Sequence, residues 1–457
     1  MQPQLRRSVF PIEGESADTL AEVFGEMCLV NLRSRGAAGR PAVALRVLLL
    51  VSSLALLALC VATPAANAAW SPPLDLSDTG QNAASPRVAV GDDNSAIVVW
   101  TRNNGSNEIA QAKWISPSGA AGSLIELSQA GQNAYNPNVA MAPDGTSTAV
   151  WSRYNGSNWI VQTRQIDPNG NAGPMQELSA VGGNAQEPDV AVADDGTATV
   201  VWHRFDSGIP VTQSVQISPT GLVGGVQDLS DSTHDGDNPD VGVSADGTAQ
   251  VTWRWDTNGA GQYVIQTRQI DPAGTLGPMH TVSAVSTGLD RPLIATGPDG
   301  ISIIVWRPST GSYTYGAYAQ ISADGTVGSA QDLNDTSINS FGFGLAMSDN
   351  GTATASWAQS DGGSGFQIWS RPISPSGIAG TSRPISDPSP DAFNAVVAAA
   401  PGGTATVTWA EDNGSGRYQI ASATISPSGV AAAPIYLSDS GEDAFGNYVA
   451  VGANGLP

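Results

Sequence analysis

The sequence predicts an all-β fold in which one four-stranded unit is repeated around a common axis. The first observation is a tryptophan that recurs every 51 to 53 residues, at Trp100, Trp151, Trp202, Trp253, Trp306, Trp357 and Trp409. The second is a Leu-Ser element with the same period, whose apolar residue is Leu76, Leu127, Leu178, Leu229, Val282, Leu333, Ile385 and Leu437. The third is that no segment after residue 69 has the apolar period of a helix. A fixed period of this size is typical of repeat architectures.

Residues 188–204, PDVAVADDGTATVVWHR, show the first half of the unit. An apolar run is followed by an Asp-Gly turn and by a second run that is rich in β-branched residues and ends in Trp202. Asp-Gly between apolar runs favours a hairpin, because glycine adopts a positive φ at little cost. β-branched residues favour strands. We therefore expect the first and second strands of the unit here.

The second half of the unit is clearest in residues 160–166, IVQTRQI, where apolar and polar residues alternate. A polar loop, often Asn-Gly-Ser, precedes this third strand, and a Pro- and Gly-containing turn such as residues 167–170 follows it. A fourth strand then ends in the Leu-Ser element. Four short antiparallel strands in about 50 residues are typical of a β-propeller blade.

Seven full units lie between Leu76 and Leu437, with an additional fourth strand before them and a Leu-Ser element with a first strand after them, at residues 436–452. We expect seven blades, and a ring of eight with an incomplete last blade is the alternative. In the pattern of its Trp, turn and Leu-Ser elements, the chain from residue 70 to residue 457 resembles secreted bacterial β-propeller repeat proteins, most of them uncharacterised. The resemblance implies a single propeller domain over residues 69–457 and specifies no reaction.

Residues 40–68 are predicted to be a signal peptide. Arg40 and Arg46 precede an uncharged apolar run at residues 47–62, and small residues follow at Ala66 and Ala68. The run is shorter than the about 20 residues of a membrane-spanning helix, so cleavage is favoured over a retained membrane anchor. We expect a secreted or cell-surface protein. Residues 1–39 are predicted to be an N-terminal extension, and a later translation start is the alternative.

The charge balance restricts the partners. The chain has 41 acidic and 19 basic residues, a formal net charge of −22, which disfavours nucleic acid and anionic membrane surfaces. The two cysteines, Cys28 and Cys60, precede the propeller, so no disulfide is expected within it. We expect a monomer.

No catalytic motif stands out. The histidines after residue 69 are His203, His234 and His280, and none has a His-x-x-x-His spacing. A Gly-x-Ser-x-Gly nucleophile motif is absent. Arg102, Arg153 and Arg204 each follow a Trp by two positions, a periodicity that favours a structural role. We therefore predict no catalytic residue and no enzymatic activity, and a hydrolase or lyase with unrecognised residues is the alternative.

Two features depart from the repeat and are the candidate binding residues. One is a set of aromatic residues near the loops between second and third strands, of which Tyr154, Phe205 and Trp255 occupy three successive units. The other is an acidic loop, residues 231–240, with Asp231, Asp235 and Asp237. Aspartate oxygens are ligands for Ca²⁺, but the loop lacks the spacing of a helix–loop–helix calcium site, so an ordinary turn is favoured and no cofactor is expected.

Both features are predicted to lie on one face of the ring, because the loops that carry them emerge at the same end of the strands. Exposed aromatic side chains stack on sugars or anchor a protein partner. The sequence therefore favours an exported, non-enzymatic propeller that binds a glycan or a protein through this face. A structural or cell-surface scaffold with no small ligand is the alternative from another class.

Overall fold

The structure is a computed structural model that describes residues 70–457 except 207, 364, 389–390, 442 and 456. The predicted extension (1–39) and signal peptide (40–68) lie outside the described residues. All regular secondary structure in the described part is β-strand. A search of that part for a helix with the length and hydrophobicity to cross a membrane found none.

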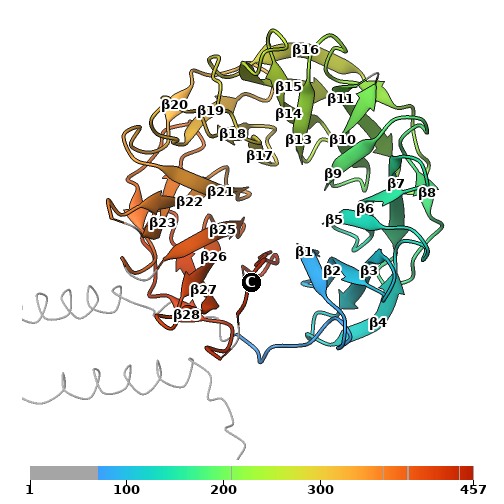
Figure 1. Cartoon of the computed structure of the whole chain (residues 1–457), viewed down its shortest axis with the longest axis horizontal. Coiled ribbons are helices and arrows are strands. Elements are labelled where there is room, and N and C mark those ends of the chain that lie inside the picture. The colour runs from blue at the N-terminus through green and yellow to red at the C-terminus, as the bar shows by residue number, and fades with distance from the viewer. Residues whose placement is uncertain (1–69, 207, 364, 389–390, 442, 456) are drawn as a thin grey trace, which may run out of the picture. The chain divides into compact units, whose positions relative to one another are not determined.

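The strands form seven four-stranded blades, shown in Figure 1. The first four blades are β1 (Ala83–Val90), β2 (Ala96–Asn103), β3 (Glu108–Ile115) and β4 (Ala121–Glu126); β5 (Ala134–Met141), β6 (Ser147–Tyr154), β7 (Trp159–Ile166) and β8 (Gln176–Glu177); β9 (Ala185–Val192), β10 (Ala198–Asp206), β11 (Ile209–Ile217) and β12 (Gln227–Asp228); and β13 (Gly236–Val243), β14 (Ala249–Asp256), β15 (Tyr263–Ile270) and β16 (Leu276–Thr281).

The last three blades are β17 (Leu293–Thr296), β18 (Ser302–Trp306), β19 (Ala317–Ile321) and β20 (Gln331–Asp332); β21 (Ser340–Met347), β22 (Ala353–Ser360), β23 (Phe366–Ile373) and β24 (Arg383–Pro384); and β25 (Ala392–Ala399), β26 (Ala405–Asp412), β27 (Tyr418–Ile425) and β28 (Ile435–Tyr436). Every blade pairs its strands in chain order, with the first strand nearest the axis and the fourth at the rim (Figure 1). The predicted seven-bladed, all-β propeller is confirmed.

The recurring tryptophan is the main core residue between blades. Trp151, Trp202, Trp253, Trp357 and Trp409 are fully buried. Each packs against the preceding blade, as Trp202 of β10 does in the cluster that contains Val150 and Val161. A buried indole N–H needs an acceptor. The third strand of the same blade supplies it, because Trp202 Nε1 donates to Gln213 Oε1 at 3.1 Å.

The Leu-Ser element closes each blade at the rim. After β4, the amide of Leu127 donates to the carbonyl of Ala110, and Ser128 Oγ accepts from the amide of Ala110 at 2.9 Å. The same serine contact recurs in later blades, for example between Ser179 and the amide of Val161. The apolar residue of the element is buried while its serine satisfies a backbone amide, which is why the two residues recur together.

A β-bulge interrupts the first strand of six blades at the same place, and its first residue has a positive φ. The bulge residues with positive φ include Ser85, Asn136, Glu187, Asn238, Gly342 and Asn394. In the first four blades proline follows this residue. Positive φ is uncommon outside glycine and is concentrated at functional or strained sites. A bulge also turns the next side chain, so these positions shape the central opening.

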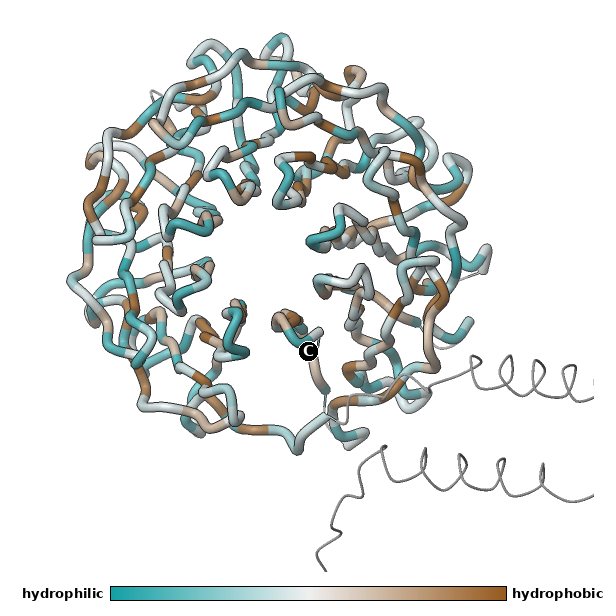
Figure 2. Tube along the Cα trace, turned by 180° about the vertical axis from the view of Figure 1, so that it is seen from behind, coloured by the Kyte–Doolittle hydropathy of each residue, from teal (hydrophilic) through white to brown (hydrophobic). Residues whose placement is uncertain are grey.

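Neither terminal segment completes a blade. Residues 70–77 and 444–455 both lie between the seventh and first blades, and the views from the two sides agree (Figures 1 and 2). Asn447 Nδ2 donates to the carbonyl of Thr408 at 2.9 Å, and the guanidinium of Arg87 lies over the ring of Tyr448 at 3.9 Å. The sequence predicts a strand within residues 436–452, but in the structure β28 ends at Tyr436 and no strand follows it among the described residues. A strand needs a paired neighbour, and the part of the chain that the structure describes provides none for this segment.

We predict that Trp202→Ala destabilises the fold by about 3–5 kcal/mol, because it leaves a cavity between two blades. Chemical denaturation followed by circular dichroism measures the loss. Trp70→Ala is the matched control, because Trp70 is 39% exposed and its truncation leaves no closed cavity. An unchanged denaturation midpoint in Trp202→Ala would contradict the core role.

Candidate functional site

The loops that connect fourth to first strands and second to third strands lie on one face, as predicted; we call it the loop face. Asn133, just before β5, accepts at Oδ1 from the amide of Glu108 at 3.0 Å. Its carbonyl accepts from the amide of Tyr154 at 2.8 Å. Asn184 repeats both contacts with Trp159 and Phe205. One residue thus connects adjacent blades on this face, because its side chain accepts from the preceding blade and its main-chain carbonyl accepts from its own blade.

The three predicted aromatic residues lie at the loop-face ends of the second strands in successive blades, and all three are half-buried. Each has one ring neighbour. The ring of Tyr154 lies 5.5 Å from that of Trp159, Phe205 is 5.4 Å from His203, and Trp255 is 5.4 Å from His234. The structure brings them to one face but not into one cluster. Each therefore forms a separate ring pair in its own blade on that face.

Sequence reasoning missed further aromatic pairs at the same level. Phe341 and Phe366 pair in the sixth blade at 4.7 Å, and Phe393 and Tyr418 pair in the seventh at 4.8 Å. Tyr135, which is 38% exposed, lies 5.5 Å from Trp159 in the second blade. The signal was available, because an aromatic residue stands one position before the bulge of these first strands. Aromatic side chains therefore occur on the loop face in blades two, three, four, six and seven.

The predicted acidic residues mostly have structural partners. Asp237 forms a two-point ion pair with Arg254, at 2.9 Å to Nε and 2.7 Å to Nη2. Asp231 accepts from the amide of Thr233 at 2.9 Å within its own turn. Asp235 occupies the repeat position of Asn133, and its carbonyl accepts from the amide of Asp256. These contacts favour an acidic turn.

Calcium binding by this loop is the alternative to the predicted ordinary turn, and it stays untested. Over the described residues, no group of three or more His, Cys, Asp or Glu side chains has an arrangement that would hold a metal ion. The calcium alternative therefore has no support from the geometry. The loop remains a candidate for ligand contact because its tip is exposed at Asp231.

A polar chain around the central opening was not predicted. It is formed by the residues that end the bulges together with Arg291, which lies just before β17. Asn138 Nδ2 donates to Asp189 Oδ1, and Asp189 Oδ2 accepts from the amide of Val241 at 3.3 Å. Asp240 Oδ2 accepts from the amide of Ile294 at 2.8 Å, and Arg291 Nη2 lies 3.4 Å from Asp240 Oδ1. Each side chain crosses to the next blade.

Beside this chain lies a hollow of about 150 Å³, lined by Arg87, Asn136, Glu187 and Arg291 among others. Arg87 donates from Nη1 to the carbonyl of Pro86 at 3.0 Å. Glu187 Oε2 lies 3.8 Å from His203 Nδ1. The hollow is therefore lined by two guanidinium groups, a carboxylate and an amide, all of which can form hydrogen bonds.

Burial shapes the ionisation of this cluster. It raises the pKa of Asp240 well above its ordinary value, and the neighbouring Asp189 acts in the same direction while Arg291 opposes it. Burial alone would lower the pKa of Arg291, but Asp240 and Asp189 outweigh it and the pKa is raised. Burial lowers the pKa of Arg87 and that of His203, against the influence of Glu187 on the histidine. Asp240 therefore retains a proton at pH values where an exposed aspartate has lost it.

One signal for this cluster was present in the sequence. A polar residue, proline and a second polar residue recur at residues 85–87, 136–138, 187–189 and 238–240 with the period of the repeat. The pattern was missed because such a tripeptide also occurs in ordinary turns. The third residue of the tripeptide contacts the next blade in three of these blades, and this contact exists only once the first strands are arranged around one axis.

No protein-family model and no curated protein sequence matches the chain. Among solved structures, a lectin from Burkholderia pseudomallei superposes with a TM-score of 0.51 at 12% identity, over 78% of this chain and 99% of the lectin. The β-propeller domain of the Trilobed protease from Pyrococcus furiosus follows at 0.48 and 11%, over 79% and 99%, and an α-L-arabinofuranosidase from Fusarium graminearum at 0.42 and 11%, over 78% and 95%. At these identities the likeness to the lectin shows the fold alone, and the two lower scores carry no argument.

We predict that Asp240→Asn flattens the pH dependence of the free energy of unfolding. A carboxyl group whose folded pKa is raised contributes stability below its unfolded pKa, and that contribution is lost as the pH rises through the folded pKa. The amide keeps an acceptor for Ile294 and a donor for Asp189, and it does not titrate. Urea denaturation from acid to neutral pH measures the difference.

The matched control is Asp246→Asn in an exposed turn, where hydrogen bonds from Ser244 lower the pKa of the carboxyl group. A carboxyl group whose folded pKa is lowered stabilises the fold at pH values above its unfolded pKa. Asp246→Asn should therefore remove a stabilisation that increases with pH, which is the opposite of the effect expected for Asp240→Asn. Equal pH slopes for the original chain and Asp240→Asn would show that Asp240 is already charged in the folded state.

Proposed function

We propose that this propeller is exported and binds carbohydrate through its loop face, without catalysing a reaction. The observation that supports it is the series of aromatic side chains at the loop-face ends of successive blades, around a polar central hollow. The C–H faces of sugars pack on aromatic rings, while their hydroxyl groups exchange hydrogen bonds with amide, guanidinium and carboxylate groups. The loop face supplies both kinds of group.

The spacing of the aromatic residues favours an extended ligand. Tyr154 and Phe205 are equivalent residues of the second and third blades, and Trp255 of the fourth blade stands one position earlier in the repeat, where Arg153 and Arg204 stand in the other two. An extended glycan that follows the rim meets one ring per blade. The polar hollow beside Arg87 and Arg291 lies toward the axis from these rings, so a branch or terminal unit directed inward meets charged partners.

The arrangement of carboxylates supports binding over hydrolysis. Hydrolysis by a carboxylate pair requires both groups to face the scissile bond of the substrate. Asp189 and Asp240 instead accept from backbone amides of the next blade and face Arg291. Neither lines the hollow, whereas Glu187 does. A hydrolase and a scaffold without a small ligand remain the alternatives that the experiments below distinguish.

We predict that Tyr154→Ala, Phe205→Ala and Trp255→Ala each weaken glycan binding by about 2 kcal/mol, because each removes a stacking surface. A glycan array identifies a ligand for the original chain, and calorimetric titration of that ligand measures the variants. Leu222→Ala is the control, since Leu222 is 74% exposed in a turn on the opposite face. Turnover of the ligand during titration would favour the hydrolase alternative.

Unaltered glycan affinity in all three folded variants would show that these aromatic residues do not form the binding site. The acidic loop at Asp231 and Asp235 is then tested by adding calcium and following heat stability, because an ion that binds the folded state alone raises it. An original chain that binds no glycan on the array would contradict the proposal.

We also predict that the mature chain lies outside the cytoplasmic membrane and begins near Ala69, after cleavage of the segment that ends at Ala68. Mass spectrometry of the exported protein identifies its first residue. Detection of residues 1–39 on exported protein would show that this segment is retained.

A further inference from the structure

We infer that the glycan bound by the loop face is acidic, and that Arg153 and Arg204 hold its anionic groups. The inference rests on the proposed function, since it names the class of glycan for the same surface. The two arginines occupy one repeat position, two residues after the recurring Trp, in the second and third blades. Both lie near the loop-face end of their second strand.

These guanidinium groups lack the partners that other arginines of the structure have. Over the part of the chain that the structure describes, no hydrogen bond or ion pair is found for Arg153, and the Nε atoms of Arg153 and Arg204 are buried without an acceptor. By contrast, Arg164 Nε donates to the carbonyl of Gly173 at 2.6 Å. A buried donor without an acceptor costs free energy. Both arginines are half-buried, so a ligand can reach them from the loop face.

The same repeat position has a structural role in the sixth and seventh blades. There Gln359 and Glu411 accept a hydrogen bond from Nε1 of the Trp two residues before them, at 3.1 and 2.9 Å. In the second and third blades the third strand supplies this acceptor, from Gln162 and Gln213. An arginine cannot accept a hydrogen bond. The core therefore does not need an arginine at this position, and the two cations are available for another partner.

Arg204 faces an aromatic cluster of the second blade. Residues two apart in a strand lie on the same side of the sheet, so Arg204 faces the second blade as Trp202 does. On the facing side of that blade, the ring of Trp159 lies 5.5 Å from those of Tyr135 and Tyr154. A guanidinium and three aromatic rings thus border the same gap between two blades.

The loop that enters the third blade connects these two groups. Asn184 Oδ1 accepts from the amide of Trp159 at 2.9 Å. The preceding residue, Gly183, lies against the guanidinium, since a Cβ at this position would be 3.1 Å from Arg204 Nη2. An aromatic surface beside a cation fits a sugar with an acidic group, because the C–H face packs on the ring while carboxylate or sulfate oxygens accept from the guanidinium.

The local charge favours an anion, although the chain as a whole is acidic. The loop-face segments of the second blade, residues 128–138 and 152–160, contain an arginine and no Asp or Glu. Glu187 of the third blade has a partner of its own, since its Oε2 lies 3.8 Å from His203 Nδ1. Charges attract over about 8 Å at physiological ionic strength, so the groups at the site outweigh the net charge of −22.

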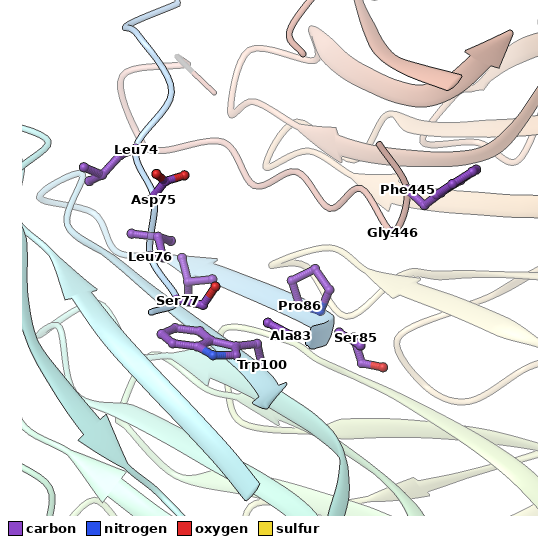
Figure 3. A pocket seen from close by; sticks show the side chains of 12 residues that line it. Leu74, Asp75, Leu76, Ser77, Ala83, Ser85, Pro86, Trp100, Phe445 and Gly446 are labelled. Atoms are coloured by element: carbon purple, nitrogen blue, oxygen red, sulfur yellow. The ribbon is translucent and has the colours of Figure 1, made fainter. Parts of the chain in front are cut away.

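A hollow beside the first blade fits an acidic ligand less well. It measures about 500 Å³ and lies between Trp100 and Leu76 on one side and Phe445 on the other, as Figure 3 shows. The charged side chain in its lining is Asp75, which would repel an acidic group. An aromatic surface alone therefore does not define the site, whereas an aromatic surface with a free cation does.

Two pairs of probes test the charge of the ligand. Oligogalacturonate carries a carboxylate on each sugar and its methyl ester is neutral, while dextran sulfate and dextran form the corresponding sulfate pair. We expect the full chain to bind at least one acidic probe about tenfold more tightly than its neutral counterpart in calorimetric titration. Added sodium chloride should weaken that binding. The pair that shows the difference identifies the anionic group as carboxylate or sulfate.

Substitutions locate the anionic group. Arg153→Met and Arg204→Met keep an unbranched apolar stem and remove the charge, so each should weaken binding of the acidic probe by about tenfold. Arg383→Met is the matched control, because Arg383 is exposed in β24 at the rim of the sixth blade. Circular dichroism checks folding. If a Met variant does not fold, Arg153→Lys and Arg204→Lys take its place; they keep the charge without the two-point geometry and should bind more weakly than the original chain.

Two outcomes overturn the inference. One is that both acidic probes bind no more tightly than their neutral counterparts. The other is that folded variants at Arg153 and Arg204 bind the acidic probe as tightly as the original chain does. Binding of neutral glycans alone would leave the proposed function intact and remove the acidic ligand. A chain that binds no glycan on the array contradicts the proposed function itself, so the two failures are distinguishable.

Discussion

The packing of one buried tryptophan per blade against the preceding blade is the interaction on which this structure depends. A four-stranded blade has two apolar faces and covers neither by itself, so each blade is stable only between two neighbours. Trp202 fills the space against Val150 and Val161, and its indole N–H is satisfied by Gln213 of its own blade. The geometry of the loop face follows from this arrangement, because residues such as Asn133 and Asn184 connect the loops of adjacent stacked blades.

Function in a repeated scaffold comes from positions where the blades differ. The bulge recurs around the ring, but the residue that ends it is Arg87, Asn138, Asp189 or Asp240 in the first four blades and Gly344 or Val396 in later ones. The residue that ends the bulge is therefore polar or charged in the first four blades, and it is glycine or valine in the sixth and seventh. This difference distinguishes one side of an otherwise repetitive ring from the other.

The proposed interaction surface combines two kinds of group. The loop face offers separate aromatic rings and polar groups, which suit a hydroxyl-rich ligand that makes many weak contacts. Phe445 from the C-terminal segment adds to these rings, since its ring lies 5.1 Å from that of Tyr418.

The sequence by itself determined the four-stranded unit, its seven copies, the buried Trp ladder and the shared face of the candidate loops, because strand period and turn chemistry act over a few residues. Only the tertiary structure decided which polar residues meet. Asp189, Asp240 and Arg291 belong to successive repeats, and Arg87 reaches Tyr448 only because the two ends of the chain meet. Likewise Val98 has the sequence of a buried position, and its exposure depends on the neighbour that ring closure gives it. Contacts between repeats leave no local pattern, since each partner fits its own strand equally well without the other.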